Sequence, residues 1–262
     1  MSSITGSRNL ESTRDDAVPP LEDGARLSRV EFERRYVAMT GLKKAELIEG
    51  IVSMPSPVHF QRHGMPHGRI VAWIGCYQAG TPGVEYAPDV TVRLDPENVL
   101  QPDASLLIKP ENGGRSKLSD DDFLEGAPEL VVEVASSTVG VDLGKKLAVY
   151  CRNGVREYIV WRVRDRRIDW FVLRDGSYAR LEPDEHGVHR SEVFPGLWLD
   201  RDAMLRNDTA AIRRLLAEGA AIDERDASGA SALLVATHAN RVEAARALIE
   251  AGADVNAKDR IE

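Results

Sequence analysis

The sequence predicts an α/β fold, in which a mixed sheet is flanked by helices, followed by a small all-α segment. Residues 130–135 (LVVEVA) form the most apolar stretch of the chain, which is typical of a central strand covered on both faces. Helical and strand-like patterns alternate on either side of it, as they do in α/β proteins. Near the C-terminus, residues 215–226 and 248–259 match each other at an offset of 33 residues, which indicates a repeat.

The N-terminal region is predicted to contain a tail, a helix and a hairpin. Residues 1–27 are rich in Ser, Asp, Arg and Pro and lack hydrophobic periodicity, so we expect a disordered tail. A helix is predicted to begin after Ser28, which can act as its N-cap with a Glu three residues later. Residues 45–53 show the two-residue alternation of side chains that is typical of strands, on both sides of Glu49-Gly50. This pattern indicates a hairpin with a tight turn.

A second helical segment is predicted over residues 58–78, although Gly64 and Pro66 interrupt its first turns. Short strands are then expected over residues 85–86, 90–94 and 104–108. A polar loop over residues 109–122 leads to the apolar central strand.

The second half of the domain also alternates between predicted helices and strands. Asp142 is predicted to be the N-cap of a helix that continues to Arg152 and stops at Asn153-Gly154. Further strands are expected over residues 157–162 and 167–173, before Pro195-Gly196 closes the domain. The predicted division of the chain is a tail (1–27), an α/β domain (28–205) and a repeat segment (206–262).

Composition and charge limit the possible functions. The net charge of −8 argues against tight, non-specific DNA binding, which needs a basic surface, but it suits a site with clustered carboxylates. No stretch approaches the roughly 18 apolar residues that span a bilayer, and the N-terminus lacks the pattern of a signal peptide. Two cysteines without a CxxC spacing predict neither a disulfide framework nor a zinc site. We therefore expect a cytoplasmic protein.

Three features of the middle domain indicate metal chemistry. Asp103 opens a predicted strand, Glu133 interrupts the apolar strand, and Lys145 and Lys146 lie in the first turns of the next helix. A Glu in the middle of a buried strand is costly unless it is paired or bound to a metal. An Asp and a Glu on neighbouring strands can bind one divalent cation through oxygen atoms. A nearby lysine can then orient water or stabilise the charge that develops on phosphate.

The middle domain resembles the Uma-type restriction endonuclease family, within the PD-(D/E)xK nuclease superfamily. The resemblance covers about residues 28–205, and the order and spacing of its motifs are more specific than any motif alone. The matching stretches are Ala45–Gly50, Met54–Pro57 with His59, Pro102-Asp103, Gly126–Val134, Asp142–Leu147, Tyr150, Gly154–Tyr158 and Pro195–Leu197.

The resemblance implies a restriction-endonuclease-like mixed sheet and an enzyme that hydrolyses phosphodiester bonds with Mg²⁺ or Mn²⁺. Nucleic acid, with DNA as the expected form, is the implied substrate. Since enzymes that cut duplexes often pair two sites, a homodimer is also expected. Glu46 matches an additional acidic residue near the site of the family.

The resemblance also assigns roles to individual residues. The metal-binding carboxylates fall on Asp103 and Glu133. The position two residues after Glu133, where the superfamily motif has lysine, is Ala135 in this chain. The site lysine is therefore assigned to Lys146 on the following helix, with Lys145 as the alternative.

The repeat segment, residues 206–262, resembles ankyrin repeats, whose length is 33 residues. Gly219 and Gly252 are expected to end helices in the conformation that glycine tolerates best. One full repeat and one half repeat are too few for an independent solenoid. The segment must therefore dock on the α/β domain or begin a longer array, and it is expected to bind a protein partner.

Two alternatives remain open from the sequence. His59, His63 and His67 recur every four residues and would suit zinc on a continuous helix, but Gly64 and Pro66 lie between them. We favour His59 as a residue of the site wall. The alternative function is an inactive nuclease fold that serves as a scaffold, with the ankyrin segment as a protein-interaction module.

Overall fold

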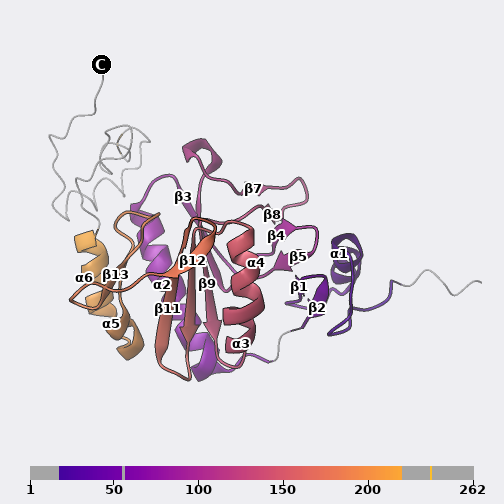
Figure 1. The fold of residues 1–262 in the computed structure, drawn as a ribbon, viewed down its shortest axis with the longest axis horizontal. Helices are drawn as coiled ribbons and strands as arrows, with labels where there is room; N and C mark the ends of the chain where they lie inside the picture. The colour runs from indigo at the N-terminus through magenta and orange to yellow at the C-terminus, as the bar shows by residue number, and fades with distance from the viewer. Residues whose placement is uncertain (1–17, 55–56, 220–236, 238–262) are drawn as a thin grey trace, which may run out of the picture.

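The computed structural model describes residues 18–54, 57–219 and 237, which form a mixed α/β domain with its first repeat helices attached (Figure 1). The strands are β1 (Glu46–Ile48), β2 (Ile51–Ser53), β3 (Val84–Pro88), β4 (Val92–Asp95), β5 (Asn98–Leu100), β6 (Ala104–Ile108), β7 (Lys117–Leu118), β8 (Leu124–Glu125), β9 (Leu130–Ala135), β10 (Glu157–Arg162), β11 (Arg167–Arg174), β12 (Ser177–Arg180), β13 (Val188–Arg190) and β14 (Trp198–Asp200). The helices are α1 (Arg29–Ala38), π-helical η1 (Phe60–Gly64), α2 (Met65–Gly80), the short η2 (Pro110–Asn112), α3 (Val139–Val141), π-helical η3 (Asp142–Lys146), α4 (Leu147–Arg152), α5 (Arg201–Arg206) and α6 (Thr209–Gly219).

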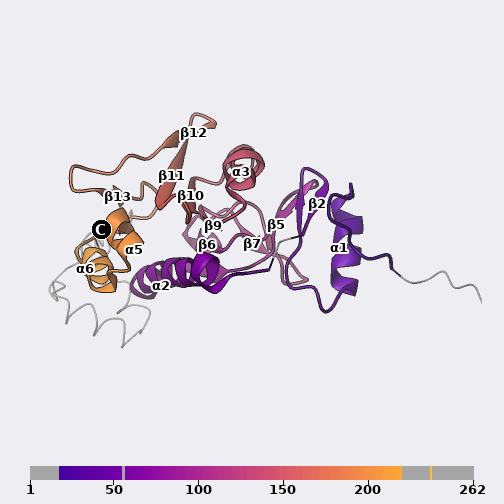
Figure 2. The same ribbon diagram turned by 90° about the horizontal axis from the view of Figure 1, so that it is seen from below.

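The main sheet has the strand order β12-β11-β10-β9-β6-β3. Its central strand β9 pairs in parallel with β10 and antiparallel with β6, so the sheet is mixed as predicted. Helix α2 covers one face of this sheet, and α3 with α4 covers the other (Figure 2). Every residue of β9 is buried, which confirms that this strand is covered on both faces.

The two faces of β9 belong to two different apolar clusters. Leu130, Val132 and Val134 pack in the cluster beneath α2, whereas Val131 and Ala135 pack in the cluster beneath α4. Since side chains alternate along a strand, Glu133 lies on the α4 side. The face of the sheet that carries Glu133 therefore agrees with the alternation seen in the sequence.

A second sheet, with the order β2-β1-β5-β4-β8-β7, carries Glu46. Its hairpin β1–β2 turns through Glu49 (φ 54°) and Gly50 (φ 73°), as the sequence predicts. Two consecutive residues with positive φ form the type I′ turn that matches the twist of a hairpin. The hairpin packs against α1, which begins after the predicted N-cap Ser28.

The expectation of a disordered tail is wrong for residues 18–27. Leu21 is buried in the cluster that also contains Phe32, and Arg26 forms a β-bridge with Ile51. The segment is ordered because it supplies both an apolar side chain and backbone partners to the hairpin; for example, the N–H of Leu27 donates to the carbonyl of Gly50. Residues 1–17 lie outside the described residues.

Two predicted helix starts also differ. The segment predicted over 58–78 begins with the π-helical turn η1, and Pro66 lies in the first turn of α2, where its missing N–H costs little. Asp142 is not an N-cap, because α3 already begins at Val139. The side chain of Asp142 instead accepts a hydrogen bond from Thr138 and lies within the protein, near Lys146.

The described part of the repeat segment docks on the α/β domain. Ala203 and Met204 of α5 and Ile212 of α6 are buried in the same cluster as α2. Helix α6 is described up to Gly219, the residue expected to end it. The rest of the repeats, with Gly252, lies outside the described residues. None of the described helices is long and apolar enough to span a bilayer.

One substitution, glycine to alanine, should have opposite effects at two positions of this fold. Gly50 has φ 73°, so Gly50→Ala should lower the free energy of unfolding by about 1 kcal/mol. Gly75 lies inside α2, and an added Cβ would meet nothing within 4 Å, so Gly75→Ala should raise it by about 0.5–1 kcal/mol. Urea denaturation of both variants checks this, and two shifts of the same sign would contradict the assigned turn.

Candidate active site

The site is built around the backbone of Val134, where the pairing between β6 and β9 ends. The last pair joins Ala104 to Val132, so the register would place Pro102 opposite Val134. Proline has no N–H, so it cannot donate to the carbonyl of Val134 and complete this pair. The N–H of Val134 donates to Oδ2 of Asp103 instead, at 2.7 Å, and its carbonyl contacts Nδ1 of His63 at 3.1 Å.

Glu133 is the buried acid of β9, and two groups from the next helical segment reach it. Lys146 Nζ lies 3.0 Å from Oε1 of Glu133, and the hydroxyl of Tyr150 donates to the same oxygen at 2.9 Å. Lys146 and Tyr150 stand four residues apart on consecutive helical turns, so they share one face. Lys146 is buried, whereas the alternative Lys145 is exposed to solvent.

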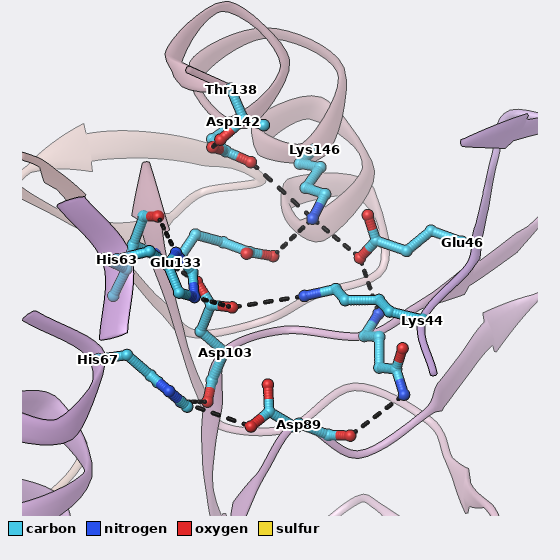
Figure 3. A network of polar contacts seen from close by, with 12 residues as sticks. Lys44, Glu46, His63, His67, Asp89, Asp103, Glu133, Thr138, Asp142 and Lys146 are labelled. Atoms are coloured by element: carbon cyan, nitrogen blue, oxygen red, sulfur yellow. Dashed lines mark hydrogen bonds and ion pairs between the residues drawn. The ribbon is translucent and has the colours of Figure 1, made fainter. Parts of the chain in front are cut away.

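Glu46 approaches the same lysine from the hairpin of the second sheet (Figure 3). Its Oε1 lies 2.9 Å from Lys146 Nζ and also accepts the backbone N–H of Gln101 at 2.9 Å. Asp142 Oδ1 is 3.8 Å from the same ammonium group. Lys146 is thus surrounded by three carboxylates from three different elements.

Lys44 provides a second cation at the site. Its Nζ lies 3.4 Å from Oδ1 of Asp103. Lys44 precedes Glu46 by two residues, which is the spacing of side chains on one face of a strand. This spacing could have indicated from the sequence that Lys44 lies beside Glu46, but the predicted site did not include Lys44.

Two histidines of the η1–α2 segment complete the wall of the site. Nε2 of His63 lies 3.5 Å from Oδ1 of Asp103. Nε2 of His67 contacts the backbone oxygen of Asp103 at 2.8 Å and lies 3.6 Å from Asp89. His59 is exposed at the start of η1, and its side chain forms no hydrogen bond or ion pair with the described residues. Neither the three-histidine zinc site nor the place in the site wall that the sequence suggested for His59 is therefore found.

Comparison with known proteins identifies the family. The family described as "Putative restriction endonuclease" (Uma2) matches residues 29–202, about two thirds of the chain. The chain belongs to this family. Ankyrin repeats match residues 203–259, which confirms the second resemblance drawn from the sequence.

Among solved structures, the Uma2 domain is similar to one titled as a "putative nuclease belonging to DUF820" from Anabaena variabilis ATCC 29413. The sequences are 16% identical, the match covers 62% of this chain and 92% of that one, and the TM-score is 0.49. No curated protein matches the chain.

The Uma2 domain holds an excess of negative charge at this site. Four carboxylates (Glu46, Asp103, Glu133 and Asp142) face two ammonium groups (Lys44 and Lys146), which gives a formal charge of −2 when every carboxylate is ionised. Burial raises the pKa of Glu133 to about 8; Lys146 acts against this rise, and the neighbouring carboxylates add to it. Burial tends to lower the pKa of Lys146, but the surrounding carboxylates outweigh it and raise that pKa above its ordinary value.

The donor atoms suit a hard divalent cation. Oδ1 of Asp103 has only the long contacts to Lys44 and His63, and Oε2 of Glu133 and Oε2 of Glu46 accept no hydrogen bond from the described residues. Carboxylate oxygens of this kind are the ligands that Mg²⁺ and Mn²⁺ use. No three His, Cys, Asp or Glu side chains of the described part of the chain converge as a ready-made cage. Lys44 and Lys146 lie among the carboxylates.

The structure brings together all four residues that the sequence singled out: Asp103, Glu133, Lys146 and Glu46. It adds Lys44, Tyr150 and Asp142, which the sequence-based prediction did not place there. Tyr150 was part of the family resemblance, but its contact with Glu133 follows only from the folded helix.

The raised pKa of Glu133 predicts a pH dependence of stability in metal-free protein. Because the folded protein holds this proton more tightly than the unfolded chain, the contribution of Glu133 to stability should be greatest below about pH 4.5. It should then fall as pH rises toward about 8, by up to about 1.4 kcal/mol per pH unit. Glu133→Gln should flatten this dependence, as measured by denaturation in a chelator at several pH values.

The exposed Glu111 provides a matched control. Glu111→Gln should leave the pH dependence of the wild type unchanged. Parallel stability curves for wild type and Glu133→Gln would mean that folding does not raise the pKa of Glu133.

Proposed function

We propose that this chain is a metal-dependent endonuclease that hydrolyses phosphodiester bonds in DNA. Membership of the Uma2 family supports nuclease chemistry. The observation that carries the proposal is the position of Lys146, held at 2.9 Å from Glu46 and 3.0 Å from Glu133 inside the protein. A buried lysine bound by acids that exceed it in charge is typical of a site that handles a further cation and an anionic substrate.

Asp103 and Glu133 are proposed to hold Mg²⁺ or Mn²⁺. When bound, such an ion lowers the pKa of its water and neutralises charge on the phosphate. The formal charge of −2 at the site equals the charge that one divalent ion offsets. The hydrogen bond from Val134 N–H to Asp103 Oδ2 fixes the carboxylate, so that Oδ1 keeps one direction.

Lys146 is proposed to act on the attacking water or on the negative charge that develops on the phosphate. Glu46, itself held by the N–H of Gln101, and Tyr150, which holds Glu133, restrict the positions that the ammonium group can take. A group fixed in this way needs little reorganisation during the reaction, which is how oriented charges lower a barrier. Glu46 is therefore proposed as a positioning residue of Lys146.

The ankyrin segment is proposed to recruit a protein partner, since that is what this repeat does in general and the match over residues 203–259 supports its presence. The homodimer and the cytoplasmic location stay predictions.

Removing a ligand and removing the lysine should have different effects. Asp103→Ala and Glu133→Gln should weaken Mn²⁺ binding and DNA cleavage together. Lys146→Ala should keep or improve Mn²⁺ affinity, because a nearby positive charge is lost, yet reduce the rate by about 10²–10³. Calorimetric Mn²⁺ titration and plasmid nicking of each variant measure the two effects.

Lys145 is the matched control, because it is adjacent in sequence and exposed. Lys145→Ala should behave like the wild type in both assays. Equal loss of metal affinity in Asp103→Ala and Lys146→Ala would indicate collapse of the site. Unchanged nicking of DNA by Glu133→Gln would contradict the proposed mechanism and favour the alternative that the nuclease fold is an inactive scaffold.

A further inference from the structure

His63 has a defined tautomer, because one of its ring nitrogens faces a group that can only accept. Nδ1 lies 3.1 Å from the backbone oxygen of Val134. A carbonyl oxygen has no proton to give, so Nδ1 must carry the hydrogen. In a neutral ring, Nε2 then has a lone pair and no proton.

That lone pair faces another acceptor. Nε2 of His63 lies 3.5 Å from Oδ1 of Asp103. Two acceptors at this separation repel each other unless a proton or a metal ion lies between them, and the ammonium group of Lys44 reaches the same Oδ1 at 3.4 Å. The carboxylate cannot easily turn away, since Oδ2 of Asp103 is held by the N–H of Val134 at 2.7 Å. The ring cannot turn away without losing its own bond to Val134.

The separation suits two ligands of one metal ion. Donor atoms about 2.1 Å from the same ion lie about 3.0–3.4 Å apart at octahedral or tetrahedral angles. The observed 3.5 Å needs only a small closure to reach this range. A histidine ligand commonly donates its other N–H to a backbone carbonyl, and Val134 provides that carbonyl here.

We propose that His63 is a ligand of the site's divalent ion through Nε2, beside Oδ1 of Asp103. The inference rests on the proposed metal site and bears on the choice between the two proposed ions, Mg²⁺ and Mn²⁺. Imidazole favours transition metals, whereas Mg²⁺ prefers an all-oxygen shell. The site should therefore select Mn²⁺ over Mg²⁺.

The other two histidines of the segment differ in the way that the proposal requires. Nε2 of His67 lies 2.8 Å from the backbone oxygen of Asp103, so this nitrogen is a donor and has no lone pair to offer there. His59 is exposed, and its side chain forms no hydrogen bond or ion pair with the described residues. His59 is therefore the matched control for a substitution in the same segment.

The test uses the full chain loaded with Mn²⁺ and pulsed electron paramagnetic resonance, which detects ¹⁴N bound directly to the ion. Wild type and His59→Ala should show this nitrogen coupling, and His63→Asn should lose it. Asparagine keeps an amide N–H near the position of Nδ1, so the bond to Val134 can persist while Nε2 is removed.

Calorimetry provides the second measurement. His63→Asn should lower Mn²⁺ affinity at least about tenfold and Mg²⁺ affinity much less, so that the preference for Mn²⁺ falls. A thermal denaturation curve of metal-free His63→Asn close to that of the wild type shows that the fold is intact. If this variant is unfolded, the nitrogen coupling in wild type and its absence in His63→Gln decide the question.

Two results would overturn the proposal: no nitrogen coupling in Mn²⁺-loaded wild type, or unchanged Mn²⁺ affinity and metal preference in His63→Asn. In either case His63 would not be a ligand of the ion. These results are separate from a failure of the proposed function. Nitrogen coupling without DNA cleavage would contradict the nuclease function but support His63 as a ligand. DNA cleavage with an ion bound only by oxygen atoms would support the nuclease function but contradict His63 as a ligand.

Discussion

The burial of Glu133 in the apolar strand β9 is the constraint on which the rest of the site depends. Each of its neighbours along the strand belongs to one of two apolar clusters, so no water shell can solvate the carboxylate. A buried carboxylate without partners would cost several kcal/mol. Lys146 and Tyr150 supply the partners, and both come from the helical segment that follows β9. The packing of η3 and α4 on the sheet is thereby linked to the chemistry of the site.

The two lysines stabilise the buried acids but do not neutralise their charge. Lys146 and Lys44 make the acidic cluster tolerable inside the fold, but the four carboxylates exceed them by two charges. A third internal cation from the chain would stabilise the folded protein further, and it would also occupy the place of an exchangeable ion. In a chain with net charge −8, a bound ion would also attract phosphate to this point. The surplus of acid is thus easier to understand as a functional feature than as a structural one.

Sequence periodicity was sufficient where a feature depends on near neighbours. The alternation of β9 predicts the face of Glu133, and Glu49-Gly50 predicts the turn that carries Glu46. Asp142, Lys44 and His63 could not be placed in this way. The Thr138–Asp142 contact and the π-helical turn η3 put Asp142 inside the helix rather than at its start. The spacing of Lys44 from Glu46 indicates a shared face, but the contacts of Lys44 and His63 with Asp103 join segments that are distant in sequence, and no local pattern predicts them.

Pro102 shows how a residue without polar chemistry of its own shapes the site. A residue with an N–H at position 102 could donate to the carbonyl of Val134, because the register of β6 and β9, if extended, places residue 102 opposite Val134. His63 would then share that carbonyl with a backbone donor. Proline removes this donor, so the carbonyl of Val134 contacts Nδ1 of His63 without that competition, while the N–H of Val134 donates to Asp103. The two backbone groups of Val134 thus orient an imidazole and an acid from different elements.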